Sequence, residues 1–241
     1  MSEDAPDVGL WFDPVCPFCW MTSKWLRSVA ERRGLTVDWR FISLRLLNSH
    51  VDYDAHFPPE YEAQHTAGLR MLRVAAAVRE GEGRAGVDAL QRAFGEAIFE
   101  QPPPAEGEPP SFGAPEMEQI LTAAGLPVSY AEALDDLARD EVIQAETDEA
   151  LRLTGKDVGT PIIQLDPPQG PSLFGPVISR LPEPAEAVEL WEHVVALARF
   201  PGFAELKRSL RERPQLPAFG VLDGQAGQVE DWHQGSRRQK K

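Results

Sequence analysis

The sequence predicts an α/β fold in which a large α-helical insertion separates two parts that contain β-strands. Strand and helix patterns alternate over residues 8–57, helical periodicity dominates residues 58–155, and strand signals return over residues 156–216. The last segment, residues 217–241, is polar and glycine-rich, and we expect it to form a flexible tail. A chain of 241 residues fits one large domain or one domain that carries an insertion.

The N-terminal part has the order strand, helix, strand. Residues 8–12 are an apolar run that predicts a short buried strand ending at Asp13. A helical pattern follows over residues 17–33, and Gly34 is typical of the residue after a helix. Residues 35–42 alternate between apolar and polar side chains, which predicts a second strand.

The central part has the pattern of several helices joined by glycine and proline breaks. We expect helices over residues 58–79 and 87–99, a break at 81–86, a proline-rich loop at 101–115 and two or three further helices up to Thr154. Ser129 and Glu132 have the spacing of a capping box, so we expect one of these helices to begin near Ser129.

The C-terminal part returns to β-structure. Residues 160–165 are rich in β-branched side chains, residues 166–171 have the composition of a turn, and residues 172–174 provide a hairpin partner. An amphipathic pattern over residues 183–199 predicts the final helix.

The formal net charge is −14, which argues against general binding to nucleic acid or to anionic membranes, because either needs a basic face. Residues 101–150 carry twelve acidic residues and one basic residue, Arg139. This segment is either a solvated helical face or a docking surface for a basic partner. No apolar run approaches the roughly 18 residues of a membrane span, and residues 1–7 lack the basic and apolar regions of a secretory signal. We therefore expect a cytoplasmic protein.

The chain has two cysteines, Cys16 and Cys19, in the motif Cys-Pro-Phe-Cys. A disulfide that closes so short a loop adds little stability. A structural zinc site needs two more ligands, and the five histidines do not have the spacing to supply them, so we expect no metal. The motif follows a buried strand and opens an amphipathic helix. This context favours redox chemistry over a chance pair, half of a metal site or two inert thiols.

The position of the motif predicts different roles for its two cysteines. Pro17 suits the first helical position, so Cys16 becomes the N-cap residue. There, free amides and the positive end of the helix dipole favour its thiolate. We expect Cys16 to attack a disulfide, and Cys19, one turn further along and less exposed, to resolve the mixed disulfide.

Four stretches of the sequence resemble a known family. They are residues 11–20, Gly159-Thr160-Pro161, Phe174-Gly175-Pro176-Val177 and Phe203-Ala204-Glu205-Leu206-Lys207. Together with the order of the elements over about residues 8–217, they resemble the DsbA-like thioredoxin-fold family, in particular its cytosolic actinobacterial branch with the mycothiol-dependent nitroreductases. Phe18 stands where these relatives commonly have tryptophan or histidine.

This resemblance implies a thioredoxin-like fold with a nucleophilic Cys16, a resolving Cys19 and a cis peptide bond before Pro161. In such folds a proline opens the strand that faces the cysteine pair, and X-Pro bonds are those that adopt the cis form at low cost. Trp20, Phe18 and Phe174 are expected to line an apolar groove beside the sulfurs. For Trp20, packing in the core is the alternative interpretation. The residues expected to bind substrate are Pro17, Phe18, Trp20, Thr160 and Pro161.

The predicted function is that of a cytosolic thiol–disulfide oxidoreductase, most simply a reductase, because the cytosol keeps dithiols reduced. The expected co-substrate is a low-molecular-weight thiol such as mycothiol or glutathione. A thioredoxin-like or mycoredoxin-like protein is the other expected partner, and no tightly bound cofactor is expected. Two alternatives remain open. One is a transferase or isomerase of the kappa-class glutathione transferase type, which shares this architecture but needs no cysteine pair. The other is a redox-sensing adaptor without catalytic activity.

Overall fold

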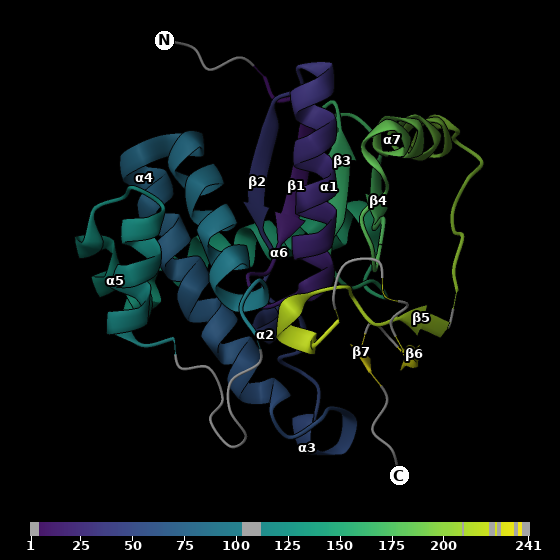
Figure 1. Cartoon of the computed structure of the whole chain (residues 1–241). Helices are drawn as coiled ribbons and strands as arrows, with labels where there is room; N and C mark the ends of the chain where they lie inside the picture. Colours follow the sequence, from purple (N-terminus) through teal and green to yellow (C-terminus); the bar gives the residue numbers. More distant parts are fainter. Residues whose placement is uncertain are drawn as a thin grey trace.

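A four-stranded mixed sheet forms the centre of the computed structural model (Figure 1), which describes residues 5–102, 112–208, 210–221, 225, 228–233 and 236–237. Its strands are β1 (Val8–Phe12), β2 (Val37–Phe41), β3 (Ile162–Leu165) and β4 (Ser172–Phe174). The order is β2-β1-β3-β4, with β1 parallel to β2 and antiparallel to β3, and β4 antiparallel to β3. The thioredoxin-like fold that the sequence predicts is therefore confirmed.

Helices cover both faces of this sheet (Figure 1). They are α1 (Pro17–Arg33) and α7 (Pro184–Arg199) on one face and α6 (Asp140–Thr154) on the other. Side chains alternate along β1: Leu10 and Phe12 enter the main core with α1, whereas Trp11 packs with Ala150 of α6. Because α6 packs on the sheet, the helical segment predicted at 58–155 ends with a helix that belongs to the sheet-containing part.

Most of the remaining helices lie between β2 and β3 in the sequence. They are α2 (Leu44–Leu47), α3 (Tyr53–His56), α4 (Tyr61–Phe99), α5 (Ala114–Ala123) and the 3-10 helices η1 (Val128–Asp135) and η2 (Leu137–Arg139). The two helices predicted at 58–79 and 87–99 are the two arms of α4, which turns at Gly83 (φ 66°, ψ −159°). Glycine reaches this backbone conformation without strain, so the predicted break is confined to one residue.

The structure corrects the prediction of a capped α-helix near Ser129. The segment is the 3-10 helix η1, which begins at Val128, and its N-cap residue is Pro127, which makes no side-chain cap. η1 packs against α4 and α5. Tertiary contacts therefore decide the conformation here, and the Ser129–Glu132 spacing does not form a capping box.

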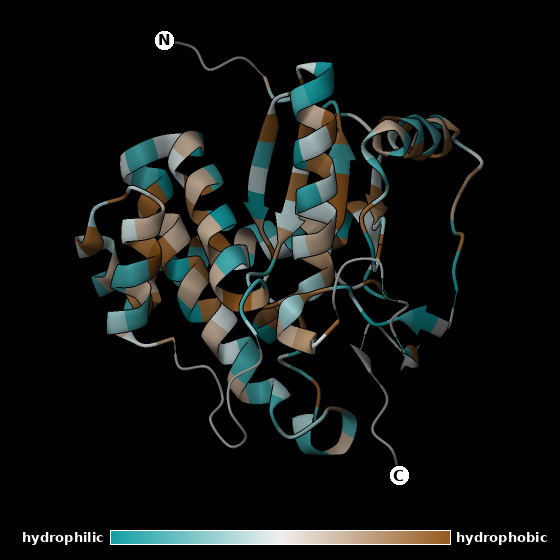
Figure 2. Cartoon of the chain, viewed as in Figure 1, coloured by the Kyte–Doolittle hydropathy of each residue, from teal (hydrophilic) through white to brown (hydrophobic). Residues whose placement is uncertain are grey.

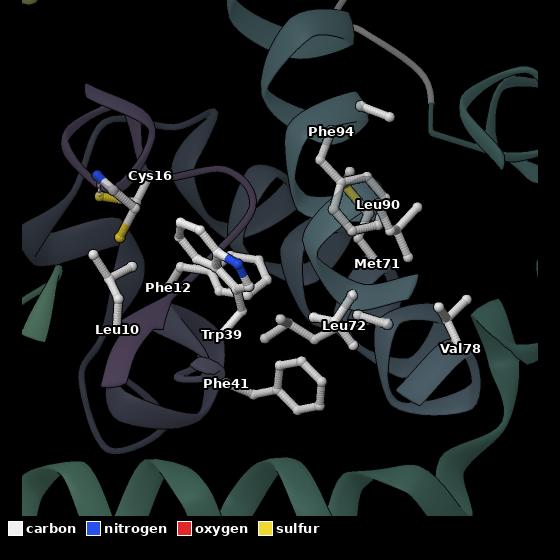
Figure 3. Close-up of a cluster of buried hydrophobic side chains, with 14 of the residues drawn as sticks. Leu10, Phe12, Cys16, Trp39, Phe41, Met71, Leu72, Val78, Leu90 and Phe94 are labelled. Atoms are coloured by element: carbon white, nitrogen blue, oxygen red, sulfur yellow. Dashed lines mark hydrogen bonds between the residues drawn. The ribbon is translucent and has the colours of Figure 1, made fainter. Parts of the chain in front are cut away.

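The sheet and the helical insertion share one hydrophobic core. A single cluster contains buried residues of β1, α1 and β2 together with residues of α4 and α5. Figure 3 shows Cys16 at the edge of this cluster near Leu10 and Phe12, with Met71 and Phe94 of α4 on the far side. In Figure 2, hydrophobic residues lie where α4 and α5 face the interior. The insertion is thus packed as part of one body with the sheet.

The C-terminal segment carries more regular structure than its composition predicts. The elements beyond α7 are β5 (Leu210–Glu212), η3 (Pro217–Phe219), β6 (Val229–His233) and β7 (Ser236–Arg237). The three strands form a second small sheet in the order β5-β6-β7. Leu216, between β5 and η3, is completely buried. The predicted flexible tail over 217–241 therefore contains a 3-10 helix and two strands in the part that the structure describes.

Most of the predicted proline-rich loop, residues 103–111, lies outside the described residues. Within the described ranges, no helix is both long and apolar enough to cross a bilayer. Those same ranges contain no group of three potential metal ligands among histidine, cysteine, aspartate and glutamate.

Candidate active site

Cys16 occupies the N-cap position of α1, directly after the turn that follows β1. Its backbone is extended (φ −85°, ψ 113°), and Pro17 takes the first helical position, where a residue without an amide hydrogen breaks no helical bond. The Cys19 amide donates a hydrogen bond to the Cys16 Sγ at 3.4 Å, so the sulfur caps the helix. This is the local geometry that the sequence predicts.

Two opposing effects act on the Cys16 thiol. Burial raises its pKa and is the largest single effect, and the nearby charge of Asp13 acts in the same direction. Hydrogen bonds from the Cys19 side chain, the Thr160 side chain and the Cys19 amide favour the thiolate. The hydrogen bonds prevail together, and the pKa of Cys16 lies below its ordinary value.

Cys19 has the opposite electrostatic environment. Burial raises the pKa of Cys19 well above its ordinary value, and the hydrogen bond and the charge of Cys16 raise it further. Both thiols are free, and the exposed fraction is 1% for Cys19 and 6% for Cys16. Because the thiolate is the reactive species, this asymmetry makes Cys16 the better nucleophile of the pair at neutral pH.

Thr160 and Pro161 lie beside the cysteine pair, although they are far from it in the sequence. The Thr160 carbonyl oxygen is 3.9 Å from the Cys16 Sγ. The Thr160–Pro161 peptide bond is cis, as are Pro167–Pro168 and Gly175–Pro176. Both Thr160 and Pro161 are buried. The structure thus brings Cys19 and Thr160 to the Cys16 sulfur, and Pro161 follows Thr160 in the chain.

Trp20 packs into the interior. It is 4% exposed and belongs to an apolar cluster with Phe99 and Leu216. Its Nε1 donates a hydrogen bond to Glu100 Oε1 at 2.6 Å, and a β-carbon at Gly95 would overlap the indole ring. These contacts favour the packing interpretation of Trp20 over a position in a substrate groove.

Phe18, Pro17 and Phe174 differ in exposure. Phe18 is 3% exposed, whereas Pro17 and Phe174 are half-buried. In the β3–β4 hairpin, Phe174 pairs with Ile162, the residue that follows Pro161 in the chain. Of the predicted binding residues in the cysteine motif, Pro17 therefore offers the most accessible surface.

Asp13 is a buried acid that the sequence interpretation used only as the end of a strand. It is 1% exposed, and its carboxylate accepts hydrogen bonds from the Val15 amide at 3.0 Å and the Leu44 amide at 2.7 Å. Burial raises the pKa of Asp13 to about 7 despite these two bonds. An acidic residue between an apolar strand and a reactive cysteine was the signal that could have identified it.

Gly68 of α4 makes room for this carboxylate. A β-carbon at Gly68 would lie 2.6 Å from Asp13 Oδ1 and 3.0 Å from Val15 Cγ2. Asp13 therefore fixes the β1–α1 and β2–α2 connections at a point where α4 approaches closely. The sequence carries no signal for this three-way contact.

An aromatic group borders the same region. His65 contacts three rings, those of Tyr53, Phe57 and Tyr61, and the Tyr53 hydroxyl lies 2.9 Å from His65 Nδ1. Burial lowers the pKa of His65 to about 4, and the Arg45 charge acts in the same direction. His65 is therefore neutral at pH 7 and adds no positive charge near the cysteines.

Arg211 of β5 reaches the cysteine motif from the C-terminal segment. Its guanidinium carbon lies 6.0 Å from the centroid of the Phe18 ring. No pattern in the sequence singles out this residue, because the contact depends on how the C-terminal segment folds back.

A surface hollow of about 570 Å³ lies elsewhere, between α4 and the 3-10 helices. Its lining includes Glu80, Glu132, Asp136 and Arg139, and none of the predicted site residues. This acidic hollow matches the charged segment noted in the sequence and is separate from the cysteine motif.

The fold and the paired thiols define the class: a thioredoxin-like protein with a Cys-x-x-Cys motif at the start of its first helix. Residues 15–208 match the family described as Rv2466c-like, mycothiol-dependent nitroreductase Rv2466c. The chain belongs to this family, as the resemblance in the sequence predicted.

One curated relative and two solved structures illustrate the relationship. The uncharacterized protein Rv2286c of Mycobacterium tuberculosis is 31% identical over 212 residues, which cover 88% of this chain and 83% of the relative. The structure of 2-hydroxychromene-2-carboxylate isomerase is 16% identical, with a TM-score of 0.52, and the match covers 80% of this chain and 96% of the isomerase. The cytosolic disulfide reductase DsbM from Pseudomonas aeruginosa is 18% identical, with a TM-score of 0.48, over 79% of this chain and 99% of DsbM. At these identities, the likeness to the isomerase shows the fold alone.

Proposed function

We propose that this protein is a cytoplasmic thiol–disulfide reductase that uses Cys16 as its nucleophile and Cys19 as its resolving thiol. The observation that carries the proposal is the placement of two free thiols within one helical turn, with the Cys16 Sγ as the N-cap of α1 and 3.4 Å from the Cys19 amide. The opposite directions of their pKa shifts support it. The two cysteines can then take different roles, because the Cys16 thiolate can attack a disulfide while Cys19 keeps its proton until that first step is complete.

The chemistry proceeds in two exchange steps. The Cys16 thiolate attacks one sulfur of a substrate disulfide, whose S–S bond breaks, and the other substrate sulfur leaves as a thiolate that takes up a proton. Cys19 then loses its proton and attacks the Cys16 Sγ of the mixed disulfide. The second substrate thiolate leaves, and a Cys16–Cys19 disulfide remains. Two electrons have passed from the dithiol to the substrate.

A second thiol must reduce the Cys16–Cys19 disulfide again. We propose mycothiol for this role, on the basis of the family description, with glutathione or a thioredoxin-like or mycoredoxin-like protein as the candidates to compare. One thiol forms a mixed disulfide with the protein, and a second releases it as the thiol's own disulfide. In a cytoplasm that keeps such thiols reduced, this cycle runs toward substrate reduction.

Trapping the intermediate tests this division of roles. Cys19→Ser removes the resolving thiol and leaves Cys16 and its helix-cap contacts in place, so a covalent adduct should accumulate on Cys16. Cys16→Ser should accumulate at least tenfold less, because burial disfavours the Cys19 thiolate. Intact-mass spectrometry after incubation with mycothiol disulfide or glutathione disulfide measures both. Equal adduct on the two variants would contradict the assignment.

Turnover assays separate the proposal from its alternatives. The wild-type protein should reduce a disulfide catalytically with one of the recycling thiols, whereas an adaptor would show no turnover. An isomerase or transferase that activates a bound thiol would keep its activity in the Cys16→Ser, Cys19→Ser double variant. Because the family description names nitroreduction, a nitroaromatic compound belongs beside the disulfide as a second electron acceptor.

A further inference from the structure

The segment that follows α7 places a positive charge beside the cysteine motif. The Arg211 guanidinium carbon lies 6.0 Å from the centre of the Phe18 ring, and Phe18 stands between Cys16 and Cys19 in the chain. Arg211 is half-buried, so its field is screened less by water than that of an exposed arginine.

The neighbours of Arg211 hold this segment in place. The Gln215 amide donates a hydrogen bond to the Ser179 carbonyl at 2.7 Å, and Leu216 is buried against Trp20. Glu212 accepts hydrogen bonds from Ser179 at 3.2 Å and from Arg180 at 2.8 Å. Arg211 therefore lies on a strand that is fixed on its C-terminal side.

The electrostatic environment of Cys16 involves an acid, Asp13, and a base, Arg211. Asp13, on the β1–α1 connection, disfavours the thiolate. Burial lowers the pKa of Arg211, and the Cys16 charge raises it, so the two groups interact favourably. An arginine side chain is not deprotonated in proteins. Its charge is therefore present throughout the titration of Cys16.

We propose that Arg211 is a positioning residue that stabilises the Cys16 thiolate from outside the cysteine motif, through its charge above Phe18. This inference deepens the proposed function and rests on it for the exchange step. In the recycling half of the cycle, a second thiolate attacks the sulfur of the recycling thiol in its mixed disulfide with Cys16, that S–S bond breaks, and Cys16 leaves as a thiolate. A nearby positive charge favours both this departure and the initial attack.

Substitution of the charge tests the proposal. Arg211→Gln should lower the rate of Cys16 alkylation at pH 7 by roughly two- to threefold, the loss of thiolate that a rise of about 0.3–0.5 pKa unit produces. The whole pH profile should move to higher pH, while the rate at its alkaline plateau stays unchanged. The equilibrium with glutathione should shift by a similar factor toward the Cys16–Cys19 disulfide, because the reduced form loses stabilisation. Arg211→Lys should keep most of the wild-type profile.

Arg213→Gln is the matched control. Arg213 lies two residues further along, and its guanidinium carbon stacks over Phe219 at 5.5 Å from the ring centre. Its loss removes the same charge from the same segment and should leave the profile of Cys16 in place. An unshifted profile in Arg211→Gln, or an equal shift in both glutamine variants, overturns the proposal.

Circular dichroism and the Cys19→Ser adduct assay distinguish the two levels of inference. If Arg211→Gln is folded and the pH profile of Cys16 alkylation does not shift, but the Cys19→Ser variant still traps an adduct, the role of Arg211 fails and the reductase proposal stands. If no adduct forms on the Cys19→Ser variant, the reductase proposal fails, whatever the profile of Cys16.

Discussion

The buried carboxyl group of Asp13 and the helix-capping thiol of Cys16 lie three residues apart in this chain. Asp13 makes two hydrogen bonds to backbone amides, yet burial keeps its pKa near the middle of the physiological range, at about 7. The carboxyl group therefore changes charge near neutral pH, and its charge disfavours the Cys16 thiolate. The reactivity of Cys16 is coupled in this way to the titration of its neighbour.

Asp13→Asn should make Cys16 more reactive, and the gain should depend on pH. Below the pKa of Asp13, wild type and variant both lack the charge, so their alkylation rates should agree near pH 6. Above about pH 7 the wild type carries the charge, and the variant should react about two- to fivefold faster. Alkylation from pH 6 to 9 measures this. Asp7→Asn, at the other end of β1, is the control and should follow the wild type. A constant ratio at all pH values would show that charge is not the cause.

The same titration predicts a dependence of stability on pH. The pKa of Asp13 is raised from 3.8 to about 7 on folding, so the folded state binds the proton more tightly than the unfolded state. The contribution of Asp13 to the free energy of unfolding is therefore complete below 3.8 and is lost as the pH rises to about 7. Relative to Asp13→Asn, the wild type should lose at most about 1.4 kcal/mol per pH unit between pH 5.5 and 7 in urea unfolding. If the stability of the wild type relative to Asp13→Asn instead increased over this pH range, the raised pKa of Asp13 would be contradicted.

The packing of one helix against another depends on small residues at the points of close contact as well as on the periodicity of apolar side chains. Gly95 of α4 lies against the Trp20 ring of α1, which a hydrogen bond to Glu100 holds in place. Gly95→Ala gains about 1 kcal/mol of helix propensity. It also forces a rigid indole out of position, and overpacking of this kind costs about 1–3 kcal/mol.

We therefore expect Gly95→Ala to be destabilised by up to about 2 kcal/mol, the overpacking cost less the gain in helix propensity, and to show altered tryptophan fluorescence. Urea unfolding and emission spectra measure the two effects. Ala97→Ser, two residues further along the same helix and exposed, should resemble the wild type in both. A more stable Gly95→Ala would mean that helix propensity prevails and that the ring yields easily.

The sequence predicted elements well where local chemistry sets their ends. α1 has the predicted bounds because Pro17 begins it and Gly34, with a positive φ of 66°, ends it. The prediction from the sequence was wrong where tertiary contacts determine the type and the start of a helix. The Ser129–Glu132 spacing is a local signal, but η1 packs against α4 and α5 and begins one residue earlier as a 3-10 helix. The turn of α4 was predicted to within a few residues because glycines mark it.

For the molecule as a whole, the C-terminal segment behaves as part of the core. Leu216 is fully buried against Trp20, Met21 and Phe99, next to the helix that carries the cysteines. Leu216→Ala should lower the free energy of unfolding by about 2–4 kcal/mol, the usual range for a buried leucine. Urea unfolding at pH 8 measures it.

Leu206→Ala provides the comparison for Leu216→Ala. Leu206 is 83% exposed in the same part of the chain, and its truncation should change stability by less than about 0.5 kcal/mol. If both variants are equally stable, the C-terminal segment is not held against α1 as the structure describes.

The sequence predicted those residues of the candidate site that belong to recognisable motifs. Cys16 and Cys19 share one helical turn, and Thr160-Pro161 opens a recognisable strand, so pattern and resemblance together located them. Arg211 and the packing of Trp20 depend on contacts between distant parts of the chain. The polar composition of residues 217–241 predicted a flexible tail, and a buried leucine and a few hydrogen bonds anchor the chain just before that segment.

The burial of both cysteines gives the protein an intrinsic probe of its own folding. The chain has two cysteines, and both are nearly inaccessible at the edge of the main hydrophobic cluster. The protection of Cys19 depends on α1, the central sheet and the segments that pack over them. A thiol-reactive dye therefore labels Cys19 at the rate at which this assembly opens, provided that the dye concentration outpaces reclosing. Pulsed labelling during refolding would follow the arrival of these elements in time, with no engineered fluorophore or added cysteine.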